Sequence, residues 1–374
     1  MNHPQGSEIY VGLMSGTSLD GVDVAIVEFS EFPPRVLHCQ TAPYPETLAR
    51  ALRELCQSQS TSLDALYTLD AELGEHYAAE VNSALNIAAL DRSDIIAVGC
   101  HGQTIRHSPD TATPYSAQIG DPNRLAALCG ITTVADFRRK DIAFGGQAAP
   151  LAPAFHQYLF RSEAEERVVI NIGGIANITY LAADPEASVL GFDTGPGNTL
   201  LDFWSGKNLG KSFDDGGEWA RSGKVINNLL NQMLTSEPYF VLTAPKSTGT
   251  EYFNPNWLSP FLRDDYAAED VQATLTELTA ITLDEAIRGL PVLPANCYVC
   301  GGGAHNRYLL ERIALTLPEC GVQTTAALGL DPDYVEAIAF AWLARERINL
   351  RGGNIPAVTR AQRTTILGGV YRAE

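Results

Sequence analysis

The sequence lacks any apolar run near the roughly 20 residues that a membrane-spanning helix requires. Its first eight residues, Met1–Glu8, also lack a basic segment followed by an apolar one, which is the pattern of a secretory signal. These two absences argue against a membrane anchor and a secreted protein. We therefore expect a cytoplasmic protein that does not bind a membrane.

Positive charge is also scarce, because 26 Lys and Arg residues stand against 44 Asp and Glu residues, for a net charge of −18. A broad negative field repels phosphate backbones, which argues against a nucleic-acid partner and an anionic membrane. Small anionic substrates stay possible where a local basic patch overrides the field.

Cysteine is sparse, and the seven residues are odd in number and scattered, so a disulfide framework is not expected. Cys297 and Cys300 have the spacing of a redox pair or of half a zinc site, but no second pair accompanies them. They lie in an apolar run that predicts a buried strand. We interpret them as small buried hydrophobes.

What the sequence does contain is a globular composition, with 45% hydrophobic and 19% charged residues, and at 374 residues it is long enough for two domains. Near its start, apolar residues Ile9–Met14 and Val22–Phe29 flank a Gly/Ser/Thr/Asp cluster. This pattern predicts a hairpin with a polar tip.

The tip of this hairpin has the composition of a phosphate-binding loop. Gly16, Thr17, Ser18 and Gly21 can offer backbone N–H groups and hydroxyls to phosphate oxygens, and Asp20 can stand beside a phosphate-bound Mg²⁺. An ordinary hairpin turn is the alternative that this stretch alone leaves open.

The same plan recurs at Arg167–Leu181, where two apolar runs flank Gly173 and Gly174. Two such hairpins predict a duplicated α/β fold in which each half offers a glycine turn to one ligand in the cleft between the halves. Further on, Gly301, Gly302 and Gly303 follow a predicted strand and precede a helix, a position suited to a ring or a phosphate.

Polar residues also follow predicted strands, and strand ends are where ligands collect in α/β sheets. His101 and Gln103 follow the strand Asp94–Val98, and Arg138 lies in a cationic run that can receive a carboxylate. Asp193 follows the strand Ser188–Phe192 and is placed to accept a proton. Each residue has a structural alternative: a turn histidine, a solvated run, or an Asp-capped turn.

Two other stretches resemble functional motifs. Ser205–Ser212 imitates a Walker A loop but has Ser205 where the motif needs glycine, so it is rejected. A helix opening at Asp331 and Pro332 carries an apolar face, and Glu336 lies off that face, either solvated or turned to the cleft.

Taken together, the motifs occur in the order of the sugar kinase, actin and heat-shock chaperone superfamily. The chain resembles one of its families far more closely, the bacterial anhydro-N-acetylmuramic acid kinases. Six motifs spread through nearly the whole chain carry this resemblance: Gly12–Asp23, His101–Thr104, Val134–Asp141, Asn171–Asn177, Phe192–Asn198 and Gly301–Asn306.

The resemblance implies two duplicated ribonuclease H-like (actin-like ATPase) α/β domains with mixed sheets flanked by helices and an active site in the cleft between them. Residues 1–139 and 359–374 would form the first domain and residues 140–358 the second. It also implies a homodimer, and an enzyme of cell-wall recycling that uses ATP and Mg²⁺. This enzyme opens 1,6-anhydro-N-acetylmuramic acid with water and phosphorylates O6, giving N-acetylmuramic acid 6-phosphate and ADP.

The resemblance also suggests residue roles. Asp193 would be the catalytic base, and Glu336 would help hold the water. His101, Gln103, Asp136 and Arg138 would line the sugar side. Phosphate and nucleotide contacts would come from the glycine turns already described and from the rest of the first loop, namely Leu19, Val22 and Asp23. The alternatives are an ordinary amino-sugar kinase of the same superfamily and a non-catalytic nucleotide switch.

Overall fold

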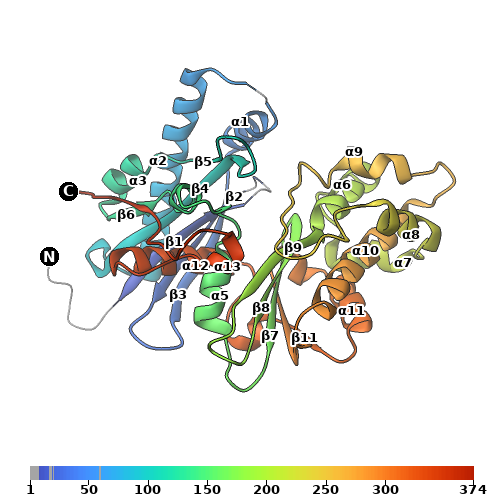
Figure 1. The fold of residues 1–374 in the computed structure, drawn as a ribbon. Helices are drawn as coiled ribbons and strands as arrows, with labels where there is room; N and C mark the ends of the chain where they lie inside the picture. The colour runs from blue at the N-terminus through green and yellow to red at the C-terminus, as the bar shows by residue number, and fades with distance from the viewer. Residues whose placement is uncertain (1–7, 17–18, 20, 59) are drawn as a thin grey trace. The chain divides into compact units, whose positions relative to one another are not determined.

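The computed structural model describes residues 8–16, 19, 21–58 and 60–374. The chain divides into two compact units (Figure 1). Unit 1 comprises Met1–Phe155 with Tyr334–Glu374, and unit 2 comprises His156–Asp333. These bounds differ from the predicted ones at 139/140 and 358/359.

Unit 1 is built on a mixed sheet with the strand order β12-β6-β4-β1-β2-β3, and β5 pairs with β4. The hairpin strands β1 and β2 are antiparallel, whereas β4 runs parallel to both β1 and β6. The strands are β1 Ile9–Ser15, β2 Gly21–Glu28, β3 Arg35–Pro43, β4 Ile95–Ser108, β5 Tyr115–Ile119, β6 Thr133–Ala135 and β12 Gly369–Tyr371.

The two faces of this sheet are covered by different helices. Alternate residues of β1, such as Val11 and Leu13, join a core with apolar residues of α1 Glu46–Gln57, α2 Leu63–Ala88 and α3 Pro122–Cys129. On the other face, α12 Val335–Ile348 lies directly against the strands. A Cβ on Gly12 would overlap the Ala337 carbonyl and one on Gly99 would overlap the Phe340 carbonyl, so the glycines permit this close approach.

The observed bounds of β4 and α12 differ from two sequence predictions. The strand expected to end at Val98 continues to Ser108, so His101 and Gln103 lie within β4 rather than in a turn. Gly99 lies in this strand because of α12, not because of a turn. The helix expected to open at Asp331 begins at Val335 and belongs to unit 1, which is why the unit boundary falls before Tyr334 rather than near residue 358.

Unit 2 repeats the plan of unit 1. Its sheet has the order β11-β10-β7-β8-β9, which matches β6-β4-β1-β2-β3 strand for strand, with β7–β8 as the antiparallel hairpin and β10 parallel to β7. The strands are β7 Arg167–Ile172, β8 Ile175–Leu181, β9 Leu190–Pro196, β10 Asn296–Cys300 and β11 Gly321–Thr324. The predicted duplicated α/β fold is therefore confirmed.

Two apolar clusters stabilise unit 2. The first joins the sheet to α10 Ala268–Arg288 and α11 Arg307–Thr316, and the second joins α10 to α6 Asn198–Leu209, α8 Asn227–Ser236 and α9 Pro255–Leu258. The Walker-like Ser205 lies inside helix α6, in agreement with its rejection. The other helices are α4 Arg139–Ala143, α5 Ala152–Phe160, α7 Glu218–Ser222 and α13 Pro356–Thr359.

Within the described residues, no helix combines the length and the apolar character that crossing a membrane requires. All seven cysteines are free thiols, and Cys297 and Cys300 are buried in β10 as predicted. Burial raises the pKa of the Cys297 thiol, which removes it further from redox or metal chemistry at neutral pH.

Candidate active site

In unit 1 the predicted phosphate loop connects β1 to β2, and buried polar side chains hold both of its ends. The Gln103 amide nitrogen donates to the Gly16 carbonyl at 3.2 Å, and the Ser15 hydroxyl lies 3.2 Å from the Gly21 carbonyl. Ser15 also donates to the Gln103 side-chain oxygen. Leu19, with φ of 57°, is buried beneath the loop. The loop therefore begins and ends at fixed points on the sheet.

Several predicted ligands of the phosphates belong to this loop or to the strand after it. Thr17, Ser18 and Asp20 lie outside the described residues. Val22 is buried in the core of unit 1, so only its backbone faces away from that core. The Asp23 carboxylate accepts a hydrogen bond of 2.6 Å from the Thr41 hydroxyl.

Gln103, predicted for the sugar side, is 1% exposed, and its carboxamide bonds to Ser15 and Gly16. The Ser15 hydroxyl accepts in turn from Tyr44 at 2.6 Å, and Tyr44 lies 3.2 Å from the Tyr77 hydroxyl. This chain of hydroxyls ends at the loop. The structure thus joins Gln103 to the phosphate loop, a link that the sequence does not reveal.

Two of the other predicted sugar-side residues, His101 and Arg138, are in contact. Arg138 Nε donates to His101 Nε2 at 3.0 Å, and Arg138 Nη1 donates to the Ala148 carbonyl at 2.6 Å. Burial and the Arg138 charge hold the pKa of His101 well below its usual range, so the ring is neutral and Nε2 accepts. Burial lowers the pKa of Arg138 to about 10, whereas the Glu336 and Asp141 carboxylates raise it. Arg138 therefore stays charged at neutral pH, and the structure groups His101, Arg138 and Glu336.

Asp136, also predicted for the sugar side, forms its ion pair with Arg139 rather than with Arg138. It adopts a left-handed backbone conformation with φ of 59°. Its carboxylate pairs with the guanidinium of Arg139 at 2.7 Å. Arg139 is 66% exposed, so this ion pair is a surface feature worth little stability.

In unit 2 the second glycine turn is held by the start of α6. The backbone N–H groups of Gly197 and Thr199 donate to the Gly174 carbonyl, and that of Asn198 donates to the Gly173 carbonyl. The Asn198 side chain donates to the Ile172 carbonyl at 3.1 Å. These bonds place Asn198 at the edge of the sheet where β7 ends.

The third glycine turn packs against the second. A Cβ on Gly301 would overlap Asn171, and one on Gly303 would overlap Ile172, the last residue before Gly173. Gly301 has φ of 76°, which a residue with a side chain rarely adopts. The structure therefore brings Gly173, Gly174 and Gly301–Gly303 together at one edge of the unit 2 sheet, as predicted for parallel strand ends.

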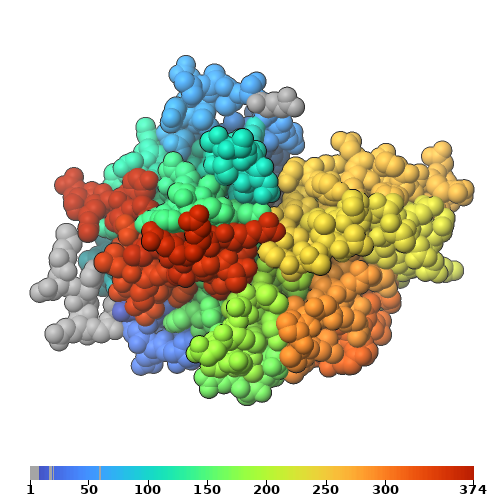
Figure 2. All heavy atoms as spheres, in the orientation of Figure 1, coloured from blue at the N-terminus to red at the C-terminus, as the bar shows by residue number. Residues whose placement is uncertain are grey.

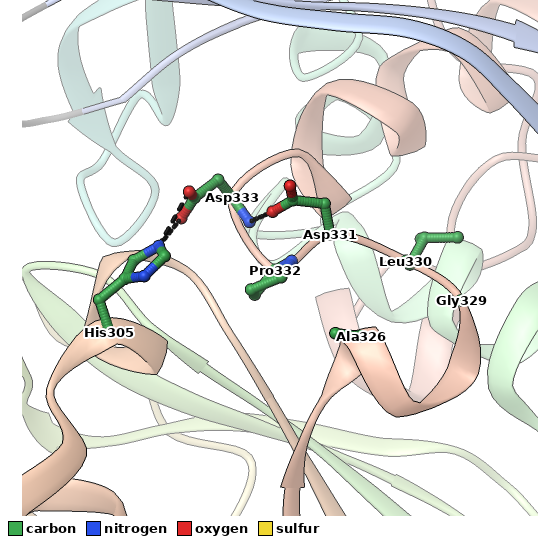
Figure 3. Close-up of a pocket in the computed structure, with 7 residues that line it drawn as sticks. All are labelled: His305, Ala326, Gly329, Leu330, Asp331, Pro332 and Asp333. Atoms are coloured by element: carbon green, nitrogen blue, oxygen red, sulfur yellow. Dashed lines mark hydrogen bonds and ion pairs between the residues drawn. The ribbon is translucent and has the colours of Figure 1, made fainter.

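A hollow of about 450 Å³ adjoins this edge (Figure 3). Its wall includes Pro332, whose carbonyl accepts from the Gly301 N–H at 2.9 Å. Figure 3 shows His305 and Asp333 pointing toward each other, with His305 Nε2 at 2.7 Å from Asp333 Oδ1. The hollow thus combines a glycine turn with a polar pair.

Asp193 lies within β9 of the same sheet, and the predicted strand end at Phe192 is wrong because the pairing of β9 with β8 continues to Pro196. One of its carboxylate oxygens, Oδ2, accepts from the Thr248 N–H at 2.9 Å. Burial raises the pKa of Asp193 to about 7; the Thr248 N–H and Lys246 act against this rise, and Glu251 adds to it. A carboxyl group with a pKa near 7 is matched to proton transfer at neutral pH.

The sequence did not reveal the residues around Asp193. The stretch Leu242–Thr250 lacks periodicity and reads as a loop without chemistry of its own, yet Lys246, Thr248 and Glu251 determine the surroundings of Asp193. The polar composition of this stretch does not specify a contact with a residue 55 positions away.

The repeated strand order, with glycine turns at the strand ends of each sheet, defines a duplicated α/β fold of the actin-like ATPase and sugar kinase class. Comparison with known proteins narrows this class. Residues 8–373 match the model of the family described as anhydro-N-acetylmuramic acid kinase. The chain belongs to this family and is a kinase.

Individual relatives agree with the family match. A protein of Pasteurella multocida named anhydro-N-acetylmuramic acid kinase is 50% identical over 368 residues, covering 98% of this chain and 97% of the relative. A Coxiella burnetii protein of the same name is 47% identical over 368 residues, covering 98% of each chain. Among solved structures, an activator of 2-hydroxyisocaproyl-CoA dehydratase from Clostridium difficile matches with a TM-score of 0.45 and 13% identity, covering 91% of this chain and 96% of that one.

Proposed function

We propose that this kinase converts 1,6-anhydro-N-acetylmuramic acid, water and ATP into N-acetylmuramic acid 6-phosphate and ADP. The observation that supports this most directly is Asp193, a carboxyl group in β9 whose pKa of about 7 suits a general base. We infer the substrate from the family to which the chain belongs, and the mechanism from the residues named below.

In the proposed reaction, Asp193 takes a proton from a water molecule whose oxygen attacks the anomeric carbon. The bond between that carbon and O6 breaks, and O6 attacks the γ-phosphorus of ATP. The bond to the β-phosphate oxygen then breaks and ADP leaves. One carboxylate thereby serves both ring opening and phosphorylation. Glu336 would help to orient the water.

The lactyl carboxylate of the sugar needs a cation, and Arg138 is our choice. Its guanidinium stays charged and is fixed by His101 and Ala148, so its position is set before the substrate arrives. Asp136 and Gln103 would act less directly, through Arg139 and through the loop respectively.

For ATP, we propose that backbone groups of both glycine hairpins bind the phosphates and that Gly301–Gly303, with the hollow beside Pro332, accept the nucleoside. Mg²⁺ would neutralise charge on the phosphates. Among the described residues no cluster of three acidic, His or Cys side chains fits a metal. Asp20, which lies outside the described residues, remains the carboxylate proposed to stand beside the phosphate-bound ion.

We further propose a homodimer in the cytoplasm that takes part in cell-wall recycling. These properties follow from the family resemblance. Size-exclusion chromatography with light scattering of the purified chain tests the dimer, and a monomeric mass at micromolar concentration would contradict it.

The test of the proposed function is ADP release with three substrates: the anhydro sugar, free N-acetylmuramic acid, and no sugar. We expect release to depend on the anhydro sugar and water. Equal or faster turnover with free N-acetylmuramic acid would indicate an ordinary amino-sugar kinase. Slow release that no sugar accelerates would indicate a nucleotide switch.

A further inference from the structure

The segment Glu237–Trp257, which we name the strap, connects α8 to α9 in unit 2 and has no role in the reaction described above. Its colour is yellow in Figure 2, where it forms part of the outer surface of unit 2. Val241 is 81% exposed, yet other strap residues reach the interior. We propose that the strap is a positioning device that holds Asp193 and sets the charge around it. This inference rests on the proposed role of Asp193 as base.

Three separate hydrogen bonds join the strap to Asp193. The Asp193 N–H donates to the Lys246 carbonyl at 3.1 Å, and the Tyr239 hydroxyl donates to the Asp193 carbonyl at 2.7 Å. The Thr248 N–H donates to Oδ2 at 2.9 Å. Amide, carbonyl and carboxylate of one residue are thus all bonded to one segment.

The strap is itself closed at both ends by one buried carboxylate, that of Glu237. It accepts from the Tyr239 N–H at 2.8 Å, from the Tyr252 hydroxyl at 2.7 Å and from the Trp257 indole N–H at 2.6 Å. The fully buried Phe253 ring packs against the rings of Tyr239 and Trp257. Such a network holds Tyr239 and its hydroxyl in one position.

Two strap side chains of opposite charge act on Asp193. The Lys246 ammonium donates to the Tyr239 and Phe240 carbonyls at 3.2 and 3.3 Å and lies 4.6 Å from the Tyr239 ring centre. The Glu251 carboxylate folds back over Gly249, next to Thr248. Glu285 on α10 faces Lys246.

These charges have opposite effects on the base. The Lys246 cation favours the ionised form and lowers the pKa of Asp193, whereas Glu251 raises it. Because the base must be ionised to accept a proton, activity falls at the acid side of its pKa. Removing the cation should therefore move this acid limb to higher pH, and removing the Glu251 charge should move it to lower pH.

The positioning role is tested first with Tyr239→Phe, measured as kcat and KM in the ADP-release assay. We expect kcat to fall roughly tenfold to a hundredfold, with the KM for ATP unchanged, because small misplacements of a catalytic group cost rates of this order. Tyr266→Phe, outside the strap in the same unit, is the matched control. Unchanged kcat in Tyr239→Phe would overturn the positioning role.

The charge effect is tested with Lys246→Met and Glu251→Gln, measured as the pH profile of kcat/KM. We expect the acid limb to move up in the first variant and down in the second, each by about half a pH unit or more. Lys246→Arg keeps the cation and should keep the limb in place. A general loss of structure cannot move the limb in opposite directions. Shifts in one direction, or no shifts, would overturn the proposal.

Asp193→Asn separates failure of this inference from failure of the proposed function. If that variant keeps full activity, Asp193 is not the base and the catalytic role proposed for it fails, whereas the proposed function itself fails if ADP release does not depend on the anhydro sugar. If it is inactive while the strap variants behave like the unmodified enzyme, only the strap's role fails.

Discussion

In unit 1 the central hairpin closes through residues 16–20, whereas in unit 2 it closes through Gly173 and Gly174. The third strand of each copy also differs, because β3 carries no acidic residue between Arg35 and Pro43, whereas its counterpart β9 carries Asp193. One strand order thus serves two tasks. The unit 1 copy has the longer loop, and the unit 2 copy has a carboxylate within its third strand.

The largest expected effect of a single substitution concerns Asp193, which has no counterpart in unit 1. Asp193→Asn should lower kcat by about 10² to 10⁴, the usual contribution of a general base, since the amide keeps the shape but cannot take the proton. ADP release with the anhydro sugar measures this. Asp202→Asn is the matched control, because burial raises the pKa of that α6 carboxyl to about 7 as well. An equal loss in both variants would contradict a special role for the carboxylate in β9.

The same substitution should stabilise the fold. Burial raises the pKa of Asp193 from its ordinary value of 3.8 to about 7, so the carboxylate is disfavoured in the folded state. Wild-type stability should therefore fall, relative to Asp193→Asn, as pH rises from about 4 to about 7, and stay constant above that. The difference approaches about 4 kcal/mol. Denaturant unfolding at several pH values measures it, and a difference independent of pH would contradict the buried carboxylate.

The sequence predicted features that depend on neighbouring residues, and it did not predict contacts between residues far apart in the chain. Apolar alternation and the Gly clusters predicted both hairpins. These signals are local. Topology then confirmed the duplication.

Long-range contacts were beyond sequence reasoning. Gly99 lies just beyond the predicted strand end at Val98, although it is a strand residue against α12. The bonds from Tyr239 and Thr248 to Asp193 span 46 and 55 residues, and no periodicity marks them. The link of Gln103 to Gly16 spans 87 residues and was missed for the same reason.

In unit 1, α12 packs directly against the backbone of β1 at Gly12. Gly12→Ala should destabilise the chain by roughly 3 kcal/mol, because its methyl group would overlap the Ala337 carbonyl of α12, and backbone cannot move aside cheaply. Gly206→Ala in α6 of unit 2 is the control, since its nearest new neighbour would be the Lys211 carbonyl oxygen at 3.7 Å. It should be neutral or stabilising. Denaturant midpoints measure both, and similar values would refute the close approach of α12.

The smallest expected effect concerns the guanidinium of Arg138 in unit 1. Arg138→Leu should raise the KM for the anhydro sugar roughly tenfold with less effect on kcat, because it removes a charge-assisted contact to the substrate. Arg139→Leu removes an exposed neighbouring cation and should leave KM unchanged. If KM is unaltered by Arg138→Leu, another residue binds the lactyl carboxylate.

The central claim is that Asp193 activates water for direct displacement at the anomeric carbon. The most direct measurement is NMR of the first product formed from the anhydro sugar and ATP, before the anomers equilibrate. A single displacement inverts the centre, so the account predicts the α-anomer of N-acetylmuramic acid 6-phosphate from the β-linked substrate. First appearance of the β-anomer would contradict it.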